Sequence, residues 1–384
     1  MNEFHYIGYA QEVIFGAGSL AQLSAAVDRF HWRRLMLCAS NSARHSGHVS
    51  SIEAALGDRL VAIYDHVQPH VPDFQVAEAT ALAAERQVDA VIGLGGGSPI
   101  GMAKAVSQTL EEKRTRHPAR ASFPTDQPLV PVVAIPTTYA GSEMTAVYGV
   151  THHADGSARK ITVTDPKITP KLVIYDPQLT LDLPPELTAS SGINALAHCV
   201  EAAYSITRHP LSTAAALSGA QHIVHALPRC HSNGDDVEAR TAMLIGSHLA
   251  AVSLCNVTMG LHHGLCHALG GTAGVPHGIA NAIVLPHAMR FNVDATAPQL
   301  AQLAEAIGLS INDRGAEAAA EAAAQRIADL IGQMNLPQRL RDVGVGKTDL
   351  PQLAQVALQS RAVQSNPKPI RDAAQIEALL EAMW

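Results

Sequence analysis

The segment that most constrains the fold is D-A-V-I-G-L-G-G-G-S-P-I-G-M-A-K, residues 89–104. It is a short apolar run followed by glycines and then by residues with helical spacing. Glycines let a backbone approach a pyrophosphate closely, and a helix N-terminus presents free N–H groups to it. The pattern is neither a Rossmann G-x-G-x-x-G nor a Walker A loop, and composition alone fits a structural tight turn equally well. As a nucleotide site, its cradle would be Gly95, Gly96, Gly97 and Ser98.

A second loop, P-T-T-Y-A-G-S-E-M-T at 136–145, also follows an apolar run. Its hydroxyl groups, on Thr137, Thr138, Ser142 and Thr145, are suited to contact phosphate or ribose. In open α/β sheets, ligands bind at the carboxyl ends of the strands, where such loops lie. Two loops of this kind favour a dinucleotide coenzyme over two unrelated tight turns.

The segments around these loops alternate between strand-like and helix-like patterns. Short apolar runs that end at polar turn residues indicate buried parallel strands, and the stretches between them have helical periodicity. This rhythm predicts a doubly wound, Rossmann-like parallel sheet in the N-terminal half of the chain. The predicted helices are 19–30, 47–57 and 74–87, and the predicted strands are 34–40, 60–64, the start of 89–100, and 131–138.

The pattern changes twice along the chain. The polar, proline-containing stretch 111–129 is typical of a surface loop, and 147–178 predicts a small antiparallel addition plus one last strand of the sheet. Further along, the strand signal disappears and alanine- and leucine-rich helical spacing continues to the end. A chain of 384 residues is too long for one hydrophobic core. We therefore expect an α/β dinucleotide-binding domain at 1–178 and an all-helical domain at 179–384.

Composition argues against several classes of function. The formal net charge of −7 is unsuited to nonspecific nucleic-acid binding, which needs a basic surface. Neither a signal-peptide pattern nor an apolar run of membrane-spanning length is present, so we expect a cytoplasmic protein with no membrane partner. The five cysteines form no C-x-x-C pair. They are therefore not expected to form a zinc knuckle or a disulfide framework. Cys199 and Cys266, each next to a histidine of interest, are expected to be small buried residues.

The residue that ends the second predicted strand bears on the choice of coenzyme. An acidic residue there usually holds the ribose hydroxyls of NAD and disfavours a 2′-phosphate. This chain has Ser40 at that position, followed by Asn41 and Ser42, with Arg44 close by. No carboxylate in this stretch would repel a 2′-phosphate. We therefore expect NADH or NADPH and not exclusive use of NAD.

The C-terminal half contains a polar helical face in S-G-I-N-A-L-A-H, which ends at His198. If 192–205 is a helix, Asn194, His198 and Glu201 fall on one side of it. An imidazole on such a face can be a metal ligand, a general acid or base, or a neutral hydrogen-bond donor.

A histidine-rich stretch, H-H-G-L-C-H-A-L-G-G-T-A-G-V-P-H, occupies 262–277. If 259–270 is a helix, His263 and His267 share a face, and His277 follows directly after a proline. Polar groups that converge at turn spacing from three segments are expected to line a site. A lone histidine on an apolar face is more often a satisfied structural residue, and we interpret four others in this way: His222, His225, His248 and His287.

These motifs, in this order, resemble the iron-containing (group III) alcohol dehydrogenase family. The resemblance runs from about residue 5 to the C-terminus and includes K-I-T-V-T-D-P-K and P-H-G-I-A-N-A-I-V-L-P-H. It implies an N-terminal dinucleotide-binding domain, a helical C-terminal domain, an active site in the cleft between them and a homodimer. Metal-dependent members hold a divalent ion at the positions that match Asn194, His198, His263 and His277 of this chain.

The chain departs from that pattern at Asn194, where metal-dependent members have an aspartate. A divalent cation gains much from an anionic oxygen, and a neutral amide offers only a weak dipole. Three imidazoles could still bind zinc, but the loss of the anionic ligand argues against a tight Fe²⁺ site. An asparagine here, the paired His262–His263 and the start F-H-Y-I-G-Y-A-Q-E resemble the maleylacetate reductase branch of the family, which is described as metal-independent.

This resemblance implies NAD(P)H-dependent reduction of the C=C bond of maleylacetate to 3-oxoadipate, in the degradation of aromatic compounds. The substrate would be a small dicarboxylate, chlorinated analogues included. His198, His263, His267 and His277 would then be hydrogen-bond donors and carboxylate binders around an enolate, with His263 or His267 as the proton donor. No metal is expected.

Four further side chains are candidates to reach the site. Lys160 is expected to contact the coenzyme or a substrate carboxylate, although an exposed surface lysine fits the sequence almost as well. Tyr139, Tyr148 and Arg290 are weaker candidates.

Three other functions fit parts of the sequence. The main alternative is a metal-dependent (Fe or Zn) alcohol or polyol dehydrogenase of the same family. A dehydroquinate synthase-like lyase would need lysines and arginines for a phosphonate-like group, and the histidine region contains few. A nonenzymatic dinucleotide sensor would not need convergent titratable groups.

Overall fold

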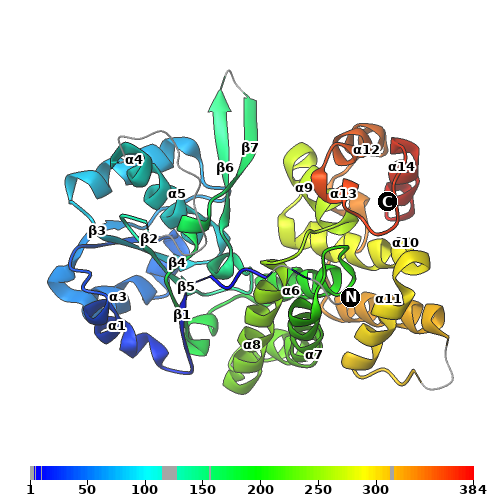
Figure 1. Cartoon of the computed structure of the whole chain (residues 1–384), viewed down its shortest axis with the longest axis horizontal. Helices are drawn as coiled ribbons and strands as arrows, with labels where there is room; N and C mark the ends of the chain where they lie inside the picture. The colour runs from blue at the N-terminus through cyan, green and yellow to red at the C-terminus, as the bar shows by residue number, and fades with distance from the viewer. Residues whose placement is uncertain (1–3, 5, 10, 115–127, 155–156, 312–314) are drawn as a thin grey trace. The chain divides into compact units, whose positions relative to one another are not determined.

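The structure of this chain is a computed structural model. It describes residues 4, 6–9, 11–114, 128–154, 157–311 and 315–384, apart from the side chains of residues 114, 153, 154 and 157–160. The chain divides into two compact units (Figure 1). One unit is Tyr6–Asp182, and the other is Leu183–Trp384 together with Met1–His5. The sequence places the boundary after residue 178, and this division falls after Asp182.

The α/β unit is built on a six-stranded sheet in the order β1-β8-β5-β4-β2-β3. Every neighbouring pair in it is parallel, which confirms the predicted parallel, Rossmann-like sheet. Its central strands consist of fully buried residues, as expected for strands covered on both faces. The strands are β1 (Glu12–Phe15), β2 (Leu35–Ala39), β3 (Leu60–Tyr64), β4 (Ala90–Gly95), β5 (Val132–Pro136) and β8 (Leu172–Tyr175).

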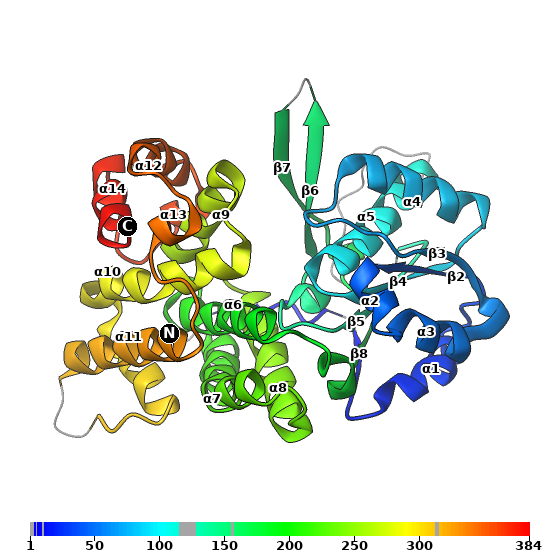
Figure 2. The same cartoon turned by 180° about the vertical axis from the view of Figure 1, so that it is seen from behind.

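Helices cover both faces of this sheet (Figures 1 and 2). Apolar residues of α1 (Leu23–Arg29) and α3 (His48–Leu56) form one core with the sheet. Those of α4 (Asp73–Glu85) and α5 (Gly97–Arg114) form the other. A short helix, α2 (Asn41–His45), directly follows β2.

A two-stranded hairpin, β6 (Val147–Ala154) with β7 (Ser157–Thr164), forms a separate antiparallel sheet. It is the antiparallel addition predicted for 147–178, and β8 is the last strand of the main sheet. The surface loop predicted for 111–129 begins later than expected, because α5 continues to Arg114. Residues 115–127 lie outside the described part of the chain.

The second unit is helical, as the sequence predicts. Its first long helix, α6, is buried along most of its length, because α7, α8 and α10 pack around it. No helix in the described ranges is both long and apolar enough to cross a membrane. The helices are α6 (Pro185–Tyr204), α7 (Pro210–Ser232), α8 (Val237–Leu254), α9 (Leu261–Ala273), α10 (His277–Ala306), α11 (Ala316–Gln333), α12 (Leu350–Leu358), α13 (Arg361–Gln364) and α14 (Ala373–Ala382).

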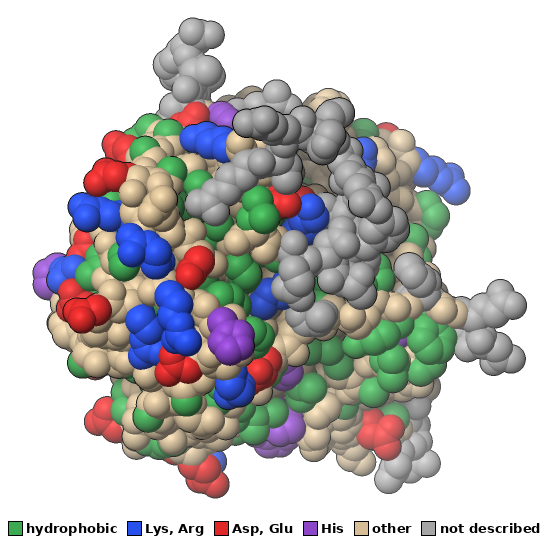
Figure 3. Space-filling model, turned by 60° about the vertical axis from the view of Figure 1, so that its left-hand side comes forward, with side chains coloured by type: hydrophobic (Ala, Val, Ile, Leu, Met, Phe, Trp, Pro, Cys, Tyr) green, Lys and Arg blue, Asp and Glu red, His purple; other side chains and the backbone are tan. Residues whose placement is uncertain are grey.

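Charged side chains are mixed on the face of the molecule drawn in Figure 3, where lysines and arginines alternate with aspartates and glutamates. The described residues visible on this face form no continuous basic patch of the kind that nucleic-acid binding needs.

Candidate active site

Helix α6 carries the first group of polar side chains. Asn194, His198 and Glu201 follow one another at one-turn spacing and are 5%, 6% and 0% exposed. Burying three polar groups on one helix is costly unless they find partners or serve a site.

Helix α9 and the start of α10 bring the other histidines to the same place. His262 and His263 are buried in the first turn of α9, and His267 is exposed one turn later. His277 is half-buried and is the first residue of α10, after Pro276.

The four predicted histidines come together. The rings of His198 and His263 stack, with centroids 4.8 Å apart and planes 13° from parallel. The His263 ring is 6.3 Å from that of His267 and 6.2 Å from that of His277. The rings of His267 and His277 stack at 5.9 Å. Side chains of α6, α9 and the start of α10 therefore contribute to one imidazole cluster.

Glu201 is the buried carboxylate of this cluster. Its Oε2 lies 2.6 Å from Nδ1 of His263, and its Oε1 accepts hydrogen bonds from the backbone N–H groups of Gly260 and His262, at 3.0 and 3.1 Å. Sequence spacing put Glu201 on the face of Asn194 and His198 but gave it no role. Its partners lie on α9, and no pattern within α6 points to them.

His262 is held by contacts inside the protein. Its Nε2 lies 3.3 Å from the backbone carbonyl oxygen of Asn281 and 3.7 Å from Sγ of Cys266. Its Nδ1 lies 3.2 Å from Nδ1 of His263. His262 therefore supports His263 and does not itself face a ligand.

Burial governs the protonation of these groups. It lowers the pKa of His262 to about 3, and also lowers the pKa values of His198 and His263. Neighbouring imidazoles add to the lowering, and for His262 the carboxylate of Glu201 opposes it. Burial raises the pKa of Glu201, while His262 and the N–H groups of α9 oppose the rise.

Three of these buried groups lie close enough together to be considered as ligands of a divalent metal ion. Glu201, His262 and His263 place ligand atoms within 4.8 Å of one another. However, Oε2 of Glu201 and Nδ1 of His263 already contact each other, and the other carboxylate oxygen is taken by N–H groups. Of the four positions that the family resemblance assigns to a metal ion, three are imidazoles and the fourth is the carboxamide of Asn194. This set does not fit a tightly held Fe²⁺ ion, because it has no free anionic oxygen.

In the α/β unit, the glycine-rich loop joins β4 to the N-terminus of α5. Gly95 has a φ of 136°, which favours glycine. A Cβ on Gly93 would lie 2.7 Å from the backbone of Ile100, so glycine here lets α5 pack closely on β4. Gly97 is exposed and has open space where a Cβ would be. The free N–H groups of α5 and this open space fit the pyrophosphate of a dinucleotide.

The loop at 136–145, called the threonine loop below, lies directly beside the glycine-rich loop. The N–H of Thr137 donates to the carbonyl of Gly95 at 3.1 Å, and a Cβ on Gly96 would lie 3.1 Å from Oγ1 of Thr138. Thr137 and Thr138 are half-buried, as is Ser142. The two loops that the sequence singled out are therefore neighbours at the carboxyl ends of β4 and β5.

Lys104 holds the far end of the threonine loop. It is fully buried, and its ammonium donates to the carbonyls of Ser142, Thr145 and Val147, at 2.6, 2.7 and 2.9 Å. The hydroxyl of Thr145 donates to the carbonyl of Ser142 at 3.2 Å, so it contributes to the loop's internal structure. Lys104 closes the G-M-A-K motif, yet the sequence does not show what it contacts.

The segment that leaves β3 also reaches these loops. The N–H of Val67 donates to the carbonyl of Ala39, at the end of β2, and the N–H of His70 donates to Oγ of Ser98 at 3.2 Å. His70 and Val71 have φ values of 67° and 51°. This left-handed backbone is costly for a β-branched residue. Sequence reasoning missed this segment, because neither residue type signals such a conformation.

Ser40 lies where the sequence predicts, directly after β2. Its hydroxyl is 2.8 Å from that of Ser42. Arg44 forms an ion pair with Asp65, the first residue after β3. A carboxylate is therefore present near the end of β2 after all, supplied by the adjacent strand and not by β2 itself.

Three of the four remaining candidates lie in the α/β unit, and the fourth lies in the helical unit. Lys160 lies in β7, and its side chain is not among those described. Tyr139 is buried in the α/β unit, and half-buried Tyr148 has its pKa raised to about 12 by burial. Arg290 pairs with Glu321 on α11, within the helical unit, at 2.6 Å.

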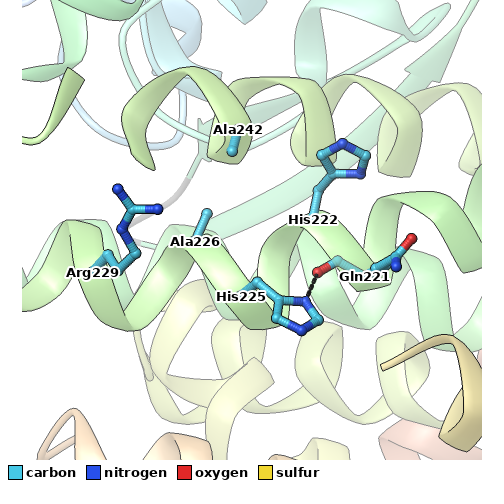
Figure 4. Close-up of a pocket in the computed structure, with 6 residues that line it drawn as sticks. All are labelled: Gln221, His222, His225, Ala226, Arg229 and Ala242. Atoms are coloured by element: carbon cyan, nitrogen blue, oxygen red, sulfur yellow. Dashed lines mark hydrogen bonds between the residues drawn. The ribbon is translucent and has the colours of Figure 1, made fainter. Parts of the chain in front are cut away.

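The histidines on α7 have ordinary helical contacts. A hollow of about 300 Å³ beside α7 and α8 is lined by His222, His225 and Arg229 among others (Figure 4). His222 and His225 contact the backbone carbonyls one turn earlier, at 2.8 and 2.7 Å. Arg229 forms ion pairs with Asp236 and Glu238. This hollow therefore lacks the convergent, buried polar groups of the imidazole cluster.

Comparisons with family models match nearly the whole chain. Residues 10–177 match the model described as iron-containing alcohol dehydrogenase. Residues 188–384 match the model of the C-terminal part of the Fe-containing alcohol dehydrogenase family.

Individual proteins agree with these matches. The chain is 35% identical to maleylacetate reductase 1 of Cupriavidus pinatubonensis, over 99% of this chain and 97% of the relative. The crystal structure of maleylacetate reductase from Agrobacterium tumefaciens is similar, with a TM-score of 0.85 and 30% identity over 100% of this chain and 99% of that one. A structure of 1,3-propanediol oxidoreductase has a TM-score of 0.92 and 30% identity, with full coverage of both chains.

Proposed function

Because the chain belongs to the iron-containing alcohol dehydrogenase family, we propose that it reduces maleylacetate to 3-oxoadipate with NADH or NADPH. The observation that carries this proposal is Asn194, a neutral amide in a buried histidine cluster at the position of the family's anionic metal ligand. The similarity to proteins named maleylacetate reductases supports the same substrate.

The proposed reaction is a conjugate reduction. Maleylacetate has a ketone conjugated to a C=C bond, with a carboxylate at each end. Hydride from the nicotinamide adds to C2, the π electrons move onto the ketone oxygen at C4 as an enolate, and C3 then takes up a proton. One NAD(P)H and one proton are consumed, and NAD(P)⁺ and 3-oxoadipate are formed.

This chemistry suits a cluster of imidazoles. The charge that develops on an enolate is less basic than that on an alkoxide, so positioned hydrogen-bond donors in a protected site can stabilise it. His198 and His263 are buried and stacked, and we assign them to the wall beside the enolate.

The proton donor is His263 or His267. His263 is buried beside Glu201, and His267 is exposed one turn later on α9, where it can exchange protons with water. His267 and His277 stack at 5.9 Å, and we assign this more accessible pair to a substrate carboxylate as well.

We propose that the reaction needs no metal ion. The carboxylate of Glu201 is engaged by four N–H groups of Gly260, His262 and His263, and Asn194 adds no charge. One observation favours the alternative, a metal-dependent alcohol or polyol dehydrogenase. Nε2 of His263 is buried and has no hydrogen-bond partner among the described residues, and such a nitrogen can bind zinc.

The coenzyme is assigned to the α/β unit. The pyrophosphate is proposed to lie at Gly95–Ser98, with the hydroxyls of Thr137, Thr138 and Ser142 beside it and Ser40 near the adenosine ribose. Thr145 supports that loop, and Lys160 remains a proposed contact. The homodimer of the family is part of the same proposal.

The test is to mix the purified protein with maleylacetate and either coenzyme, follow the nicotinamide absorbance and identify the product. Oxidation of NADH or NADPH with formation of 3-oxoadipate is expected. No oxidation with either coenzyme would overturn the function. Activity that is lost on chelation and restored by Fe²⁺ or Zn²⁺ would favour the metal-dependent alternative.

A further inference from the structure

We infer that Glu201 is a positioning residue that fixes the tautomer of His263, so that only Nε2 of His263 is available to a ligand. Its consequence for turnover rests on the proposed function, whereas the tautomer itself is a property of the protein alone. The contacts of both Glu201 oxygens carry this inference.

Glu201 first acts on the helix that carries His263. The N-cap residue of α9, Gly260, has no side chain to bind the first N–H groups of the helix, and this end of α9 is buried. Oε1 of Glu201 accepts from Gly260 and His262, and Oε2 accepts from the N–H of His263 at 3.3 Å. An anion at a helix N-terminus is stabilised by free N–H groups and by the helix dipole. Glycine at 260 also leaves room, since a Cβ there would lie 3.0 Å from Oε1.

The tautomer of His262 follows from one fixed acceptor. The backbone carbonyl of Asn281 can only accept, so Nε2 of His262, at 3.3 Å, carries hydrogen. Sγ of Cys266, at 3.7 Å, is a weak second acceptor for the same hydrogen. The His262 ring is fully buried and its Nδ1 lies 4.0 Å from Oε2 of Glu201, beyond hydrogen-bond distance, so the ring is neutral. Nδ1 of His262 is therefore an acceptor.

The tautomer of His263 then follows from two acceptors. Its Nδ1 lies 2.6 Å from Oε2 of Glu201 and 3.2 Å from Nδ1 of His262. Because both neighbours accept, Nδ1 of His263 carries the hydrogen and Nε2 has the lone pair. The structure shows no partner for that buried Nε2 among the described residues. In this neutral form His263 accepts at Nε2 and cannot donate there. It becomes a proton donor only when Nε2 takes up a proton, a charge that the carboxylate of Glu201 stabilises.

Replacing Glu201 by glutamine is a selective test of this inference. The amide oxygen can keep the bonds to Gly260 and His262, which leaves the amide nitrogen facing Nδ1 of His263. That N–H₂ group donates, so it favours the opposite tautomer, with hydrogen on Nε2. Glu186, exposed in the first turn of the same helix, is the matched control as Glu186→Gln.

The experiment is NMR of the full-length protein with ¹⁵N-labelled histidine, with His263 assigned by comparison with His263→Gln. Hydrogen on Nδ1 of His263 in the unmodified protein and in Glu186→Gln, and on Nε2 in Glu201→Gln, is the expected result. Hydrogen on Nε2 in the unmodified protein, or no change in Glu201→Gln, would overturn the inference. If Glu201→Gln does not fold, the spectrum of the unmodified protein decides alone.

Kinetics give a second readout. A reversed tautomer is expected to lower kcat for maleylacetate about 100-fold while KM for the coenzyme stays within about threefold. Glu186→Gln should match the unmodified protein. A failure of maleylacetate to react would overturn the proposed function and leave the tautomer measurement intact.

Discussion

The imidazole rings of His198 and His263 stack with their centroids 4.8 Å apart and their planes 13° from parallel. Both side chains are buried, at 6% and 4% exposure. Two cations at this separation in a buried site would repel strongly. At most one ring of the pair can therefore be charged, and Glu201 lies beside His263.

Removing either ring should impair turnover more than folding. We expect His198→Asn and His263→Asn each to lower kcat for maleylacetate by about 10²- to 10⁴-fold, the range typical of a lost acid–base or enolate-stabilising group. His225→Asn, on the exposed side of α7, is the control and should leave kcat unchanged. Equal activity of His263→Asn and His225→Asn in steady-state assays would contradict the assignment.

Stability should fall on mild acidification. Burial depresses the pKa values of His198, His262 and His263 in the folded protein below the ordinary histidine value of 6.5. These histidines therefore contribute fully to the free energy of unfolding above pH 6.5. The contribution is lost as the pH falls toward their pKa values in the folded protein, because in that interval the unfolded chain binds more protons than the folded one. The raised pKa values of Glu143 and Glu201 act in the opposite sense, favouring folding below pH 4.5 and losing that contribution as the pH rises.

Urea unfolding at pH 7.5, 6.5 and 5.5 measures this dependence. The free energy of unfolding should decrease from pH 6.5 to 5.5, and His262→Gln should flatten the decrease. A free energy that rises over this interval in the unmodified protein would contradict burial of these histidines in neutral form.

Restoring the anionic ligand should create a metal site. Asn194→Asp would add a carboxylate to His198, His263 and His277, and we expect affinity for Fe²⁺ or Zn²⁺ to rise at least about tenfold. Metal content after loading and desalting is the measurement, with a substitution at Asn233, which directly follows α7, as the control: Asn233→Asp. The account predicts one ion per chain in Asn194→Asp only, and equal metal content in both variants would contradict it.

The choice between NADPH and NADH should depend on the ion pair between Arg44 of α2 and Asp65, the residue after β3. Asp65 both neutralises Arg44 and places a carboxylate directly after β3, the strand that pairs with β2. Asp65→Asn should therefore raise the ratio of kcat/KM for NADPH to that for NADH by about tenfold, because a carboxylate at this edge disfavours the 2′-phosphate. Arg44→Gln should lower the ratio, and exposed Asp58→Asn should leave it unchanged. If neither Asp65→Asn nor Arg44→Gln changes this ratio, the adenosine ribose does not bind at this edge of the sheet.

The sequence predicted the elements whose signals are local. The buried strands and the glycine loop can be recognised from short apolar runs and their turn residues, and the histidine faces from spacing along one helix. The role of Glu201 could not be predicted, because its partners Gly260, His262 and His263 lie on α9, about 60 residues away. Asp65 was missed for a related reason. It reaches Arg44 only because β3 pairs with β2, and strand order is not visible in either strand alone.

The measurement that most directly tests the central claim is the rate of maleylacetate reduction by protein stripped of metal, with its metal content determined on the same sample. The account predicts that NADH or NADPH is oxidised at the same rate before and after stripping, with far less than one ion per chain. A rate that falls in proportion to the metal removed, and returns when Fe²⁺ or Zn²⁺ is added, would contradict it.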